Sequence, residues 1–260
     1  MQMPHSSSLP GPDAALFLDF DGTLVAIAET PEAVKVPDAM VPLLIELHDL
    51  LDGALAVVSG RPIDVLDRFL APLRLPTAGE HGAQRRDAEG ALHEAPRADL
   101  SGVLDAANGL AARHTGLLVE RKHAAVALHY RLAPQLEDLC LDVMGEAVGT
   151  DPALDLIHGK CVVEIKPAGV NKGIAIDAFL KEAPFEGRRP FFAGDDTTDE
   201  SGFAVVQAHG GLGYKVGDGG SRAQMRLESP RAVLDWLQAT RDALVARAAR
   251  TAPSQASTAS

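Results

Sequence analysis

Short apolar runs that end directly in polar clusters constrain the fold of this chain more than any other feature. Ala14–Leu18 is apolar throughout and ends in Asp19–Thr23, while Leu55–Val58 ends in Ser59–Arg61. A third apolar run, Pro190–Ala193, also ends in a polar cluster. Strands that are apolar at every position are buried on both faces, as in parallel sheets covered by helices. Together with the helical patterns between the runs, this predicts a Rossmann-like, doubly wound α/β core.

The pattern changes in the middle of the chain. Leu117–Lys122 and Ala124–Arg131 alternate between polar and apolar residues, which is typical of half-buried strands in an open-faced antiparallel sheet. Two helical segments and two further strands accompany them, and the α/β pattern returns from Asn171. We therefore expect residues 1–82 and 169–250 to form the core and residues 83–168 an inserted α+β cap domain. The small, polar residues 251–260 are expected to form a disordered tail.

Two carboxylates follow the first predicted strand and can reach one small volume. Asp19 can attack a phosphorus centre as a carboxylate nucleophile, and Asp21 can protonate the leaving oxygen and later activate water. The same residues would also fit a turn whose aspartates cap a helix, because Asp-Gly is common in turns. Their position favours catalysis, since ligands of open α/β sheets bind at the carboxyl ends of the strands.

Two further clusters could bind a phosphate. Ser59 and the N–H groups beside it precede a predicted helix and can cradle an anion, although a serine there could also be an ordinary helix cap. Lys172 follows the cap residue Asn171 and so lies in the first helical turn, where the helix dipole disfavours a cation. This placement is reasonable if Lys172 faces a bound phosphate, and the alternative is a solvated lysine.

The segment Gly194–Glu200 carries four carboxylates, which would repel one another unless a cation were present. Oxygen ligands combined with a phosphate suit Mg²⁺ better than Zn²⁺. Some of these acids could instead cap the following helix. We leave open what Asp196, Asp199 and Glu200 each do.

The order of these clusters, DxDGT, SGR, lysine and GDDxTDE, resembles the haloacid dehalogenase superfamily of aspartate-nucleophile phosphatases. The resemblance extends from about Leu16 to Val216. Within that superfamily the chain is similar to trehalose-6-phosphate phosphatases. The residues that carry this closer similarity are Gly79–Gly82, Glu120, Lys122, His129–Arg131, Glu164 and Gly169–Gly173.

The resemblance implies a set of site residues. Asp19, Asp21, Lys172 and Ser59 would be catalytic, and Mg²⁺ would be held by Asp19, the Asp21 main-chain carbonyl and Asp195. Cap side chains would hold the hydroxyl groups of the sugar, because carboxylates accept hydrogen bonds and lysine donates them. Any single Glu or Lys there could also be ordinary surface charge. The expected substrate-binding residues are Gly60, Arg61, Glu120, Lys122, Arg131 and Glu164.

The function implied is Mg²⁺-dependent hydrolysis of trehalose 6-phosphate to trehalose and phosphate through an aspartyl-phosphate, a step of trehalose biosynthesis. One alternative is a related phosphatase acting on sucrose 6-phosphate or a phosphorylated compatible solute. Another is a non-catalytic sugar-phosphate sensor or a partner subunit of a synthase. An intact set of Asp19, Asp21, Lys172 and Asp195 speaks against the sensor, which needs no nucleophile.

Composition limits the partners and the location. The net charge of −12 argues against nucleic acid as a partner, because phosphate backbones require clustered Lys and Arg. No apolar run approaches the ~20 residues needed to cross a bilayer, and the first residues lack the pattern of a secretory signal. Cys140 and Cys161 are too few for a disulfide framework. We expect a cytoplasmic protein without membrane contact, and we expect it to be monomeric.

Overall fold

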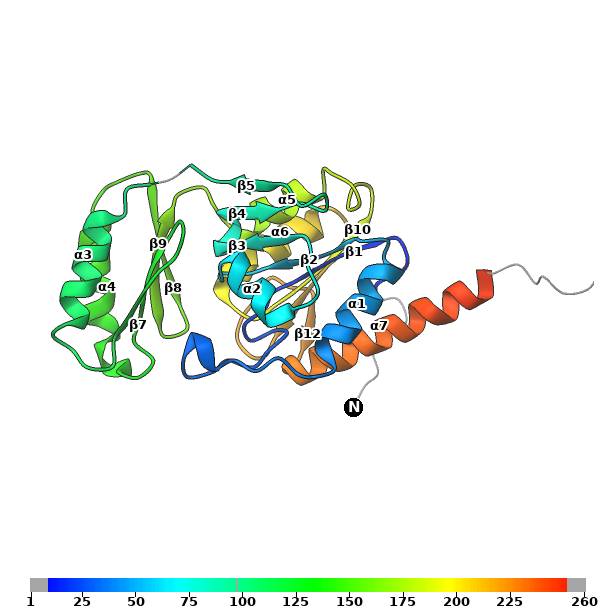
Figure 1. Ribbon diagram of the computed structural model, residues 1–260, viewed down its shortest axis with the longest axis horizontal. Helices are drawn as coiled ribbons and strands as arrows, with labels where there is room; N and C mark the ends of the chain where they lie inside the picture. The colour runs from blue at the N-terminus through cyan, green and yellow to red at the C-terminus, as the bar shows by residue number, and fades with distance from the viewer. Residues whose placement is uncertain (1–8, 97, 252–260) are drawn as a thin grey trace, which may run out of the picture.

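Two β-sheets organise the molecule (Figure 1). The computed structural model describes residues 9–96 and 98–251. Within these residues, an eight-stranded sheet has the order β12-β11-β10-β1-β2-β3-β4-β5 and a four-stranded sheet has the order β6-β7-β9-β8. We call the first sheet with its helices the core. We call the second sheet with its two helices, residues 101–167, the cap.

The core sheet is parallel except at one edge. Its strands are β1 (Ala14–Leu18), β2 (Leu55–Val58), β3 (Thr77–Gly79), β4 (Gln84–Arg86), β5 (Leu92–Glu94), β10 (Arg189–Gly194), β11 (Leu212–Val216) and β12 (Met225–Leu227). All pairs from β12 to β3 are parallel, and β4 and β5 continue the sheet in antiparallel fashion. Because β1 lies between β2 and β10 and is buried at every position, its end is at the centre of the edge.

Helices cover both faces of the core sheet. They are α1 (Met40–Leu50), α2 (Ile63–Leu70), α5 (Lys172–Phe179), α6 (Glu200–Ala208) and α7 (Pro230–Thr251). Helices α1 and α7 pack against each other on one face, and α5 and α6 pack together on the other (Figure 1). Phe17 of β1 stacks on Phe185 with ring centroids 5.3 Å apart, which anchors the strand within the apolar interior.

The cap is an antiparallel sheet with helices on one face. Its elements are α3 (Ser101–Ala111), β6 (Leu118–Arg121), β7 (Val126–His129), α4 (Glu137–Val148), β8 (Leu154–Gly159) and β9 (Val162–Pro167). Figure 1 shows α3 and α4 on the side away from the core, so the opposite face of the cap sheet is turned toward the core. The buried Tyr130 belongs to the apolar layer between this sheet and its helices. The predicted fold class, a doubly wound α/β core with an α+β cap, is confirmed.

Some elements differ from the expectation. β4 and β5 lie within residues 83–168, which we expected to belong to the cap, but they pair with the core sheet. We propose that the first boundary of the cap lies between Glu94 and Ser101. Thr251 ends α7, and the remainder of the expected disordered tail, residues 252–260, lies outside the described residues. None of the described helices combines the length and apolar character that a membrane crossing requires.

Candidate active site

The carboxyl edge of the core sheet gathers four chemically active side chains. Asp19 follows β1 and Asp195 follows β10, and the Asp19 N–H donates to the Ala193 carbonyl at 2.9 Å. Lys172 begins α5, while Asp199 lies in the 3₁₀ turn η4 (Thr197–Asp199). The parallel register of neighbouring strands therefore brings together residues that are far apart in sequence, as the continuous apolar strands predicted.

The side chain of Lys172 pairs with two carboxylates. Its Nζ lies 2.7 Å from Asp19 Oδ1 and 2.6 Å from Asp199 Oδ1, and the residue is 2% exposed. Burial by itself lowers the pKa of Lys172, but the two carboxylates raise it above its ordinary value, so the side chain is charged. The alternative of a solvated lysine is thus wrong. Asp199 was an unassigned acid, and the structure makes it the second partner of Lys172.

Three buried carboxylates could hold a cation. Oxygen atoms of Asp19, Asp195 and Asp199 all lie within 4.8 Å of one another. The pKa of Asp19 is raised well above its ordinary value by burial, although Lys172 opposes this, and burial also raises the pKa of Asp195. Such crowding of buried acids with oxygen-only ligands fits a hard cation such as Mg²⁺.

The backbone after Asp21 fits the same centre. Gly22 has φ +77°, and a Cβ built there would lie 2.2 Å from Asp195 Oδ2. This position therefore requires glycine, because the main chain passes directly against the Asp195 carboxylate. The expected ligands Asp19 and Asp195 come together, and the main chain beside Asp21 is close to them. Asp199 joins the group but already uses Oδ1 for Lys172 and Oδ2 for the Asp196 N–H.

The Asp21 side chain points to a different partner. Arg61 donates from Nε to Asp21 Oδ2 at 2.6 Å and from its NH2 nitrogen to Oδ1 at 2.8 Å. A third donor of the guanidinium reaches the Pro31 carbonyl, and the group lies over the rings of Phe20 and Phe69. We expected Arg61 to bind substrate. It lines the cavity, but its guanidinium is held by Asp21, which fixes the orientation of that carboxylate.

Ser59 lies in the short loop between β2 and α2. Its Oγ accepts the Arg61 N–H at 3.2 Å, and helix α2 begins after Pro62 without a side-chain cap. Ser59 is therefore not the ordinary cap of that helix. At Gly60, an added Cβ would lie 2.7 Å from the His81 ring, so only glycine fits between the loop and this histidine. Ser59 and Gly60 both line the cavity described below.

Lys122 and Glu164 of the cap form a buried ion pair next to this loop. Lys122 Nζ donates to Glu164 Oε2 and, at 2.9 Å, to the Gly60 carbonyl of the core. Burial opposes ionisation of Glu164, but Lys122 lowers its pKa below the ordinary value. His81 Nε2 lies 3.4 Å from Glu164, while burial lowers the pKa of His81 and keeps the ring neutral near pH 7. Lys122 therefore supplies the compensating charge.

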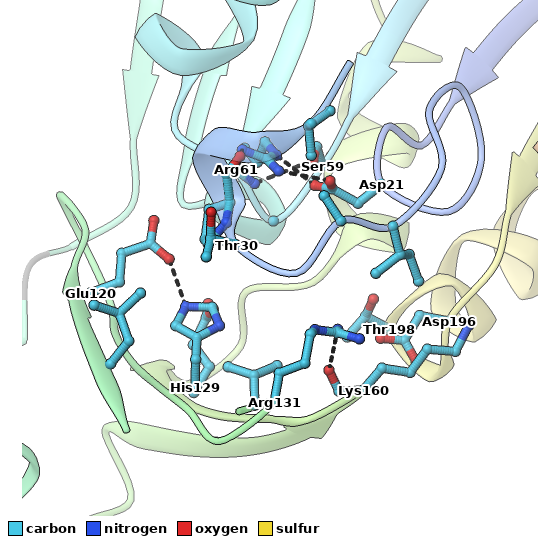
Figure 2. Close-up of a pocket in the computed structure, with 18 of the residues that line it drawn as sticks. Asp21, Thr30, Ser59, Arg61, Glu120, His129, Arg131, Lys160, Asp196 and Thr198 are labelled. Atoms are coloured by element: carbon cyan, nitrogen blue, oxygen red, sulfur yellow. Dashed lines mark hydrogen bonds and ion pairs between the residues drawn. The ribbon is translucent and has the colours of Figure 1, made fainter. Parts of the chain in front are cut away.

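A cavity of about 220 Å³ separates the core edge from the cap. Figure 2 shows Glu120, His129, Arg131 and Lys160 of the cap lining it opposite the core residues. Glu120 pairs with His129 Nε2 at 2.9 Å, and Arg131 donates to the Lys160 carbonyl at 2.9 Å. As the alternation of that strand predicted, His129 and Arg131 share the cavity face while Tyr130 is on the other.

Two acids of the Gly194–Glu200 segment have structural roles. Asp196 Oδ1 accepts the Thr197 N–H at 2.7 Å, and with Asp199 it forms a capping box at the start of η4. Glu200 accepts from Ser221 Oγ at 2.6 Å and from the Arg222 N–H at 3.0 Å, which fixes the loop after β11. Asp196 therefore caps the short turn η4, whereas helix α6, which begins at Glu200, has no side-chain cap.

Lys160 and Glu80 take part in this arrangement, although the sequence does not single out either residue by itself. Lys160 lies in the turn between β8 and β9, and its Nζ is 2.7 Å from Asp195 Oδ2, so a cap residue reaches the core cluster. A lysine in a turn carries no pattern that distinguishes it from solvated charge. Glu80 belongs to the Gly79–Gly82 segment that carries the similarity to the family, and its carboxylate is completely buried. The sequence offers one sign of this. Glu80 is a glutamate without a local partner to neutralise it, and it lies in a segment that is otherwise largely apolar and rich in glycine.

Comparison with known proteins agrees with this arrangement. The sequence model of the trehalose-phosphatase family matches residues 17–230. The chain is 46% identical over 232 residues to the trehalose-6-phosphate phosphatase of Escherichia coli strain K12, covering 88% of this chain and 87% of that protein. It is 48% identical over 208 residues to a probable trehalose-phosphate phosphatase of Sinorhizobium fredii, covering 78% and 77%.

A solved structure shares the fold. The C-terminal domain of the C. albicans trehalose-6-phosphate phosphatase superposes with a TM-score of 0.79 at 23% identity, covering 88% of this chain and 92% of that chain. The resemblance inferred from the motifs is therefore confirmed at the level of sequence and fold. This chain belongs to the trehalose-phosphatase family.

Proposed function

We propose that this protein is a Mg²⁺-dependent phosphatase that hydrolyses trehalose 6-phosphate to trehalose and phosphate, with Asp19 as the nucleophile. The observation that carries the proposal is the position of Asp19. Its carboxylate lies between Lys172 and Asp195 at the sheet edge, facing a cavity whose other wall holds the Lys122–Glu164 pair. A nucleophile and a cationic group thus face hydrogen-bonding groups suited to sugar hydroxyls.

In this proposal the core residues divide the chemistry. Asp19 attacks the phosphorus in line, and an aspartyl-phosphate forms while the bond to the sugar 6-oxygen breaks. Asp21 gives that oxygen a proton and then takes one from the water that hydrolyses the intermediate. Ser59 and Lys172 bind phosphate oxygens. Mg²⁺, held by Asp19, Asp195 and the main-chain carbonyl of Asp21, would neutralise charge on the transferring group.

Arg61 has a positioning role in this scheme rather than the expected contact with substrate. Its two hydrogen bonds to Asp21 hold the carboxylate beside the cavity while leaving Asp19 free of the guanidinium. Proton transfer requires the donor and acceptor to be within hydrogen-bond reach, so in this scheme the guanidinium releases one Asp21 oxygen before that oxygen donates its proton to the leaving group. Glu120, Lys122, Arg131 and Glu164 would contact the disaccharide, with Gly60 giving the sugar phosphate room beside the loop.

Two alternatives can be separated from this proposal. A phosphatase for sucrose 6-phosphate or a phosphorylated compatible solute would use the same core and differ in which sugar the cap accepts. A sugar-phosphate sensor would bind without turnover. The buried Asp19–Lys172–Asp199 arrangement disfavours the sensor, because burying two carboxylates and a lysine costs free energy that binding alone does not require.

The test is phosphate release from a panel of sugar phosphates, with Mg²⁺ or with EDTA. Asp19→Asn is the blank and should lower the rate on the order of 10⁴-fold or more, since the reaction loses its nucleophile. Selective, Mg²⁺-dependent release from trehalose 6-phosphate supports the proposal. Release only from other sugar phosphates would keep the chemistry and reject the substrate, and binding without release would favour the sensor.

We also infer a monomer in the cytoplasm. Cys140 and Cys161 are both free thiols, which is consistent with a reducing compartment. Light scattering coupled to size-exclusion chromatography tests the monomer, since the mass should equal that of one 27.3 kDa chain.

A further inference from the structure

Glu80 is a buried carboxylate that does not line the cavity. It lies in η2 (Glu80–Gly82), directly after β3, and is 0% exposed. Glu80 and His81 both have left-handed backbones, with φ +48° and +59°, which residues other than glycine rarely adopt. The Glu80 N–H donates to the Arg61 carbonyl and the His81 N–H to the Ser59 carbonyl. This strained turn therefore follows the contour of the Ser59–Arg61 loop.

The Glu80 carboxylate connects the core to the cap by hydrogen bonds. Its Oε1 accepts the His123 N–H at 2.8 Å, and its Oε2 accepts the Ala124 N–H at 2.6 Å. These two amides belong to the turn between β6 and β7, more than 40 residues further along the chain. The two charge-assisted hydrogen bonds that this one carboxylate accepts determine both the position and the orientation of that turn.

The turn held by Glu80 carries Lys122. The Lys122 N–H donates to the Ala125 carbonyl at 2.9 Å, so Lys122 closes the same turn. Its Nζ then reaches back to the Gly60 carbonyl and to Glu164. These contacts form a closed ring. The Ser59–Arg61 loop is hydrogen-bonded to the turn that contains Glu80, Glu80 is hydrogen-bonded to the β6–β7 turn, and Lys122 of that turn is hydrogen-bonded to Gly60 of the loop. Moving the turn would move the Lys122 ammonium relative to the loop.

We propose that Glu80 is a positioning residue that fixes Lys122, and with it the Lys122–Glu164 pair, at a set place over the Ser59–Arg61 loop. Through this placement Glu80 determines how well the enzyme selects a disaccharide phosphate over a phosphate ester that lacks the sugar. The proposal rests on the proposed function, because it assigns to that site the residue that aligns its cap with its core.

The experiment compares Glu80→Gln with native enzyme on trehalose 6-phosphate and on para-nitrophenyl phosphate. Glutamine has the same shape, but its NH₂ group meets one of the two backbone N–H donors and cannot accept from it. We expect KM for trehalose 6-phosphate to rise at least about 10-fold, because a misplaced group loses binding energy steeply. The fold loss of kcat/KM for the aryl phosphate should be at least about 10-fold smaller than the fold loss of kcat/KM for trehalose 6-phosphate.

Matched variants distinguish positioning from folding. Glu182→Gln makes the same chemical change at a core glutamate paired with Arg85, away from the cap, and should leave both substrates nearly unaffected. Glu80→Asp keeps the charge but withdraws the oxygens, so it should reproduce the selective loss even if Glu80→Gln folds poorly. In Lys122→Ala enzyme, Glu80→Gln should cause little further loss, because coupled residues are non-additive.

Hydrogen exchange gives a readout independent of turnover. Glu80→Gln should speed exchange of the His123 and Ala124 amides without changing exchange in β1. Equal losses on both substrates, additive effects with Lys122→Ala, or unchanged exchange in the turn would each overturn the proposal. Failure of the proposed function would instead be visible in the native enzyme, which would release no phosphate from trehalose 6-phosphate, and the exchange experiment would still test Glu80.

Discussion

The Lys122–Glu164 pair shows how strongly single side chains depend on their partners in this protein. Their side chains are 8% and 5% exposed, so neither charge is solvated. A buried ion pair contributes little compared with an apolar pair, but loss of one partner leaves an uncompensated buried charge and costs about 3–5 kcal/mol. Replacing Glu164 should therefore clearly lower the stability of the folded protein.

The stability of Glu164→Gln should depend on pH. In the folded protein the pKa of Glu164 lies below its ordinary value of about 4.3, mainly because Lys122 offsets the effect of burial. Its contribution to stability is therefore complete above that ordinary value and is lost as pH falls through the lower, folded-state pKa. We expect the free energy of unfolding of the native protein to exceed that of the variant by about 3 kcal/mol at pH 7. At pH 3.5 this difference should be about 1 kcal/mol smaller.

Urea unfolding at several pH values measures this difference. The exposed Glu89 provides the control, since the stability difference between native protein and Glu89→Gln should not decrease as the pH falls. A difference that stays constant from pH 7 to pH 3.5 would contradict the charge assignment for Glu164.

Two helical glycines illustrate how an element depends on what it packs against. A Cβ at Gly109 of α3 would have nothing within 4 Å, whereas a Cβ at Gly202 of α6 would lie 2.4 Å from Phe192 Cε1. The first glycine weakens its helix without any packing benefit, and the second allows α6 to approach β10 closely.

We expect Gly109→Ala to stabilise the protein by about 0.5–1 kcal/mol, because alanine favours the helix. Gly202→Ala should destabilise it by about 1–3 kcal/mol, because the helix must move from the sheet. Thermal unfolding monitored by circular dichroism would show the two melting temperatures shifting in opposite directions. Shifts of the same sign would mean that packing does not distinguish these positions.

Among the strands, those with a continuous apolar sequence could be predicted and the shortest could not. β1 and β2 are apolar and buried throughout, and β10 is so after Arg189, so their sequences alone indicate a parallel sheet. β5 is exposed at all three positions, and β12 has only three residues. Such strands form because a neighbouring strand offers free hydrogen-bonding groups, which is a property of the assembled sheet and not of the segment.

Across the whole molecule, Lys160 connects the cap to the buried carboxylate cluster of Asp19, Asp195 and Asp199. Its Nζ is 2.7 Å from Asp195 Oδ2, yet 53% of the side chain is exposed. The ammonium would therefore compete with a cation bound in the proposed Mg²⁺ site for Asp195, while water weakens the interaction. Two unit charges about 4 Å apart interact by roughly 1 kcal/mol in water, which corresponds to about a fivefold change in affinity.

We expect Lys160→Ala to bind Mg²⁺ about fivefold more tightly than the native protein in titration calorimetry without substrate. The difference should decrease at high salt, because exposed charges are screened. Lys181→Ala, which removes an exposed lysine paired with Asp177, should leave Mg²⁺ affinity unchanged. Equal or weaker Mg²⁺ binding by Lys160→Ala would show that Lys160 does not compete for Asp195.

The doubly wound core, the order of its motifs and the meeting of Asp19, Lys172 and Asp195 at one sheet edge could all be predicted from the amino-acid sequence. These follow from local patterns, since continuous apolar strands are buried and their carboxyl ends share an edge. The folded structure was needed to show that Arg61 holds Asp21, that Lys160 reaches Asp195 and that Glu80 binds the β6–β7 turn. Such partners are distant in the chain, and a charged side chain takes the partner that the folded backbone brings within hydrogen-bond distance.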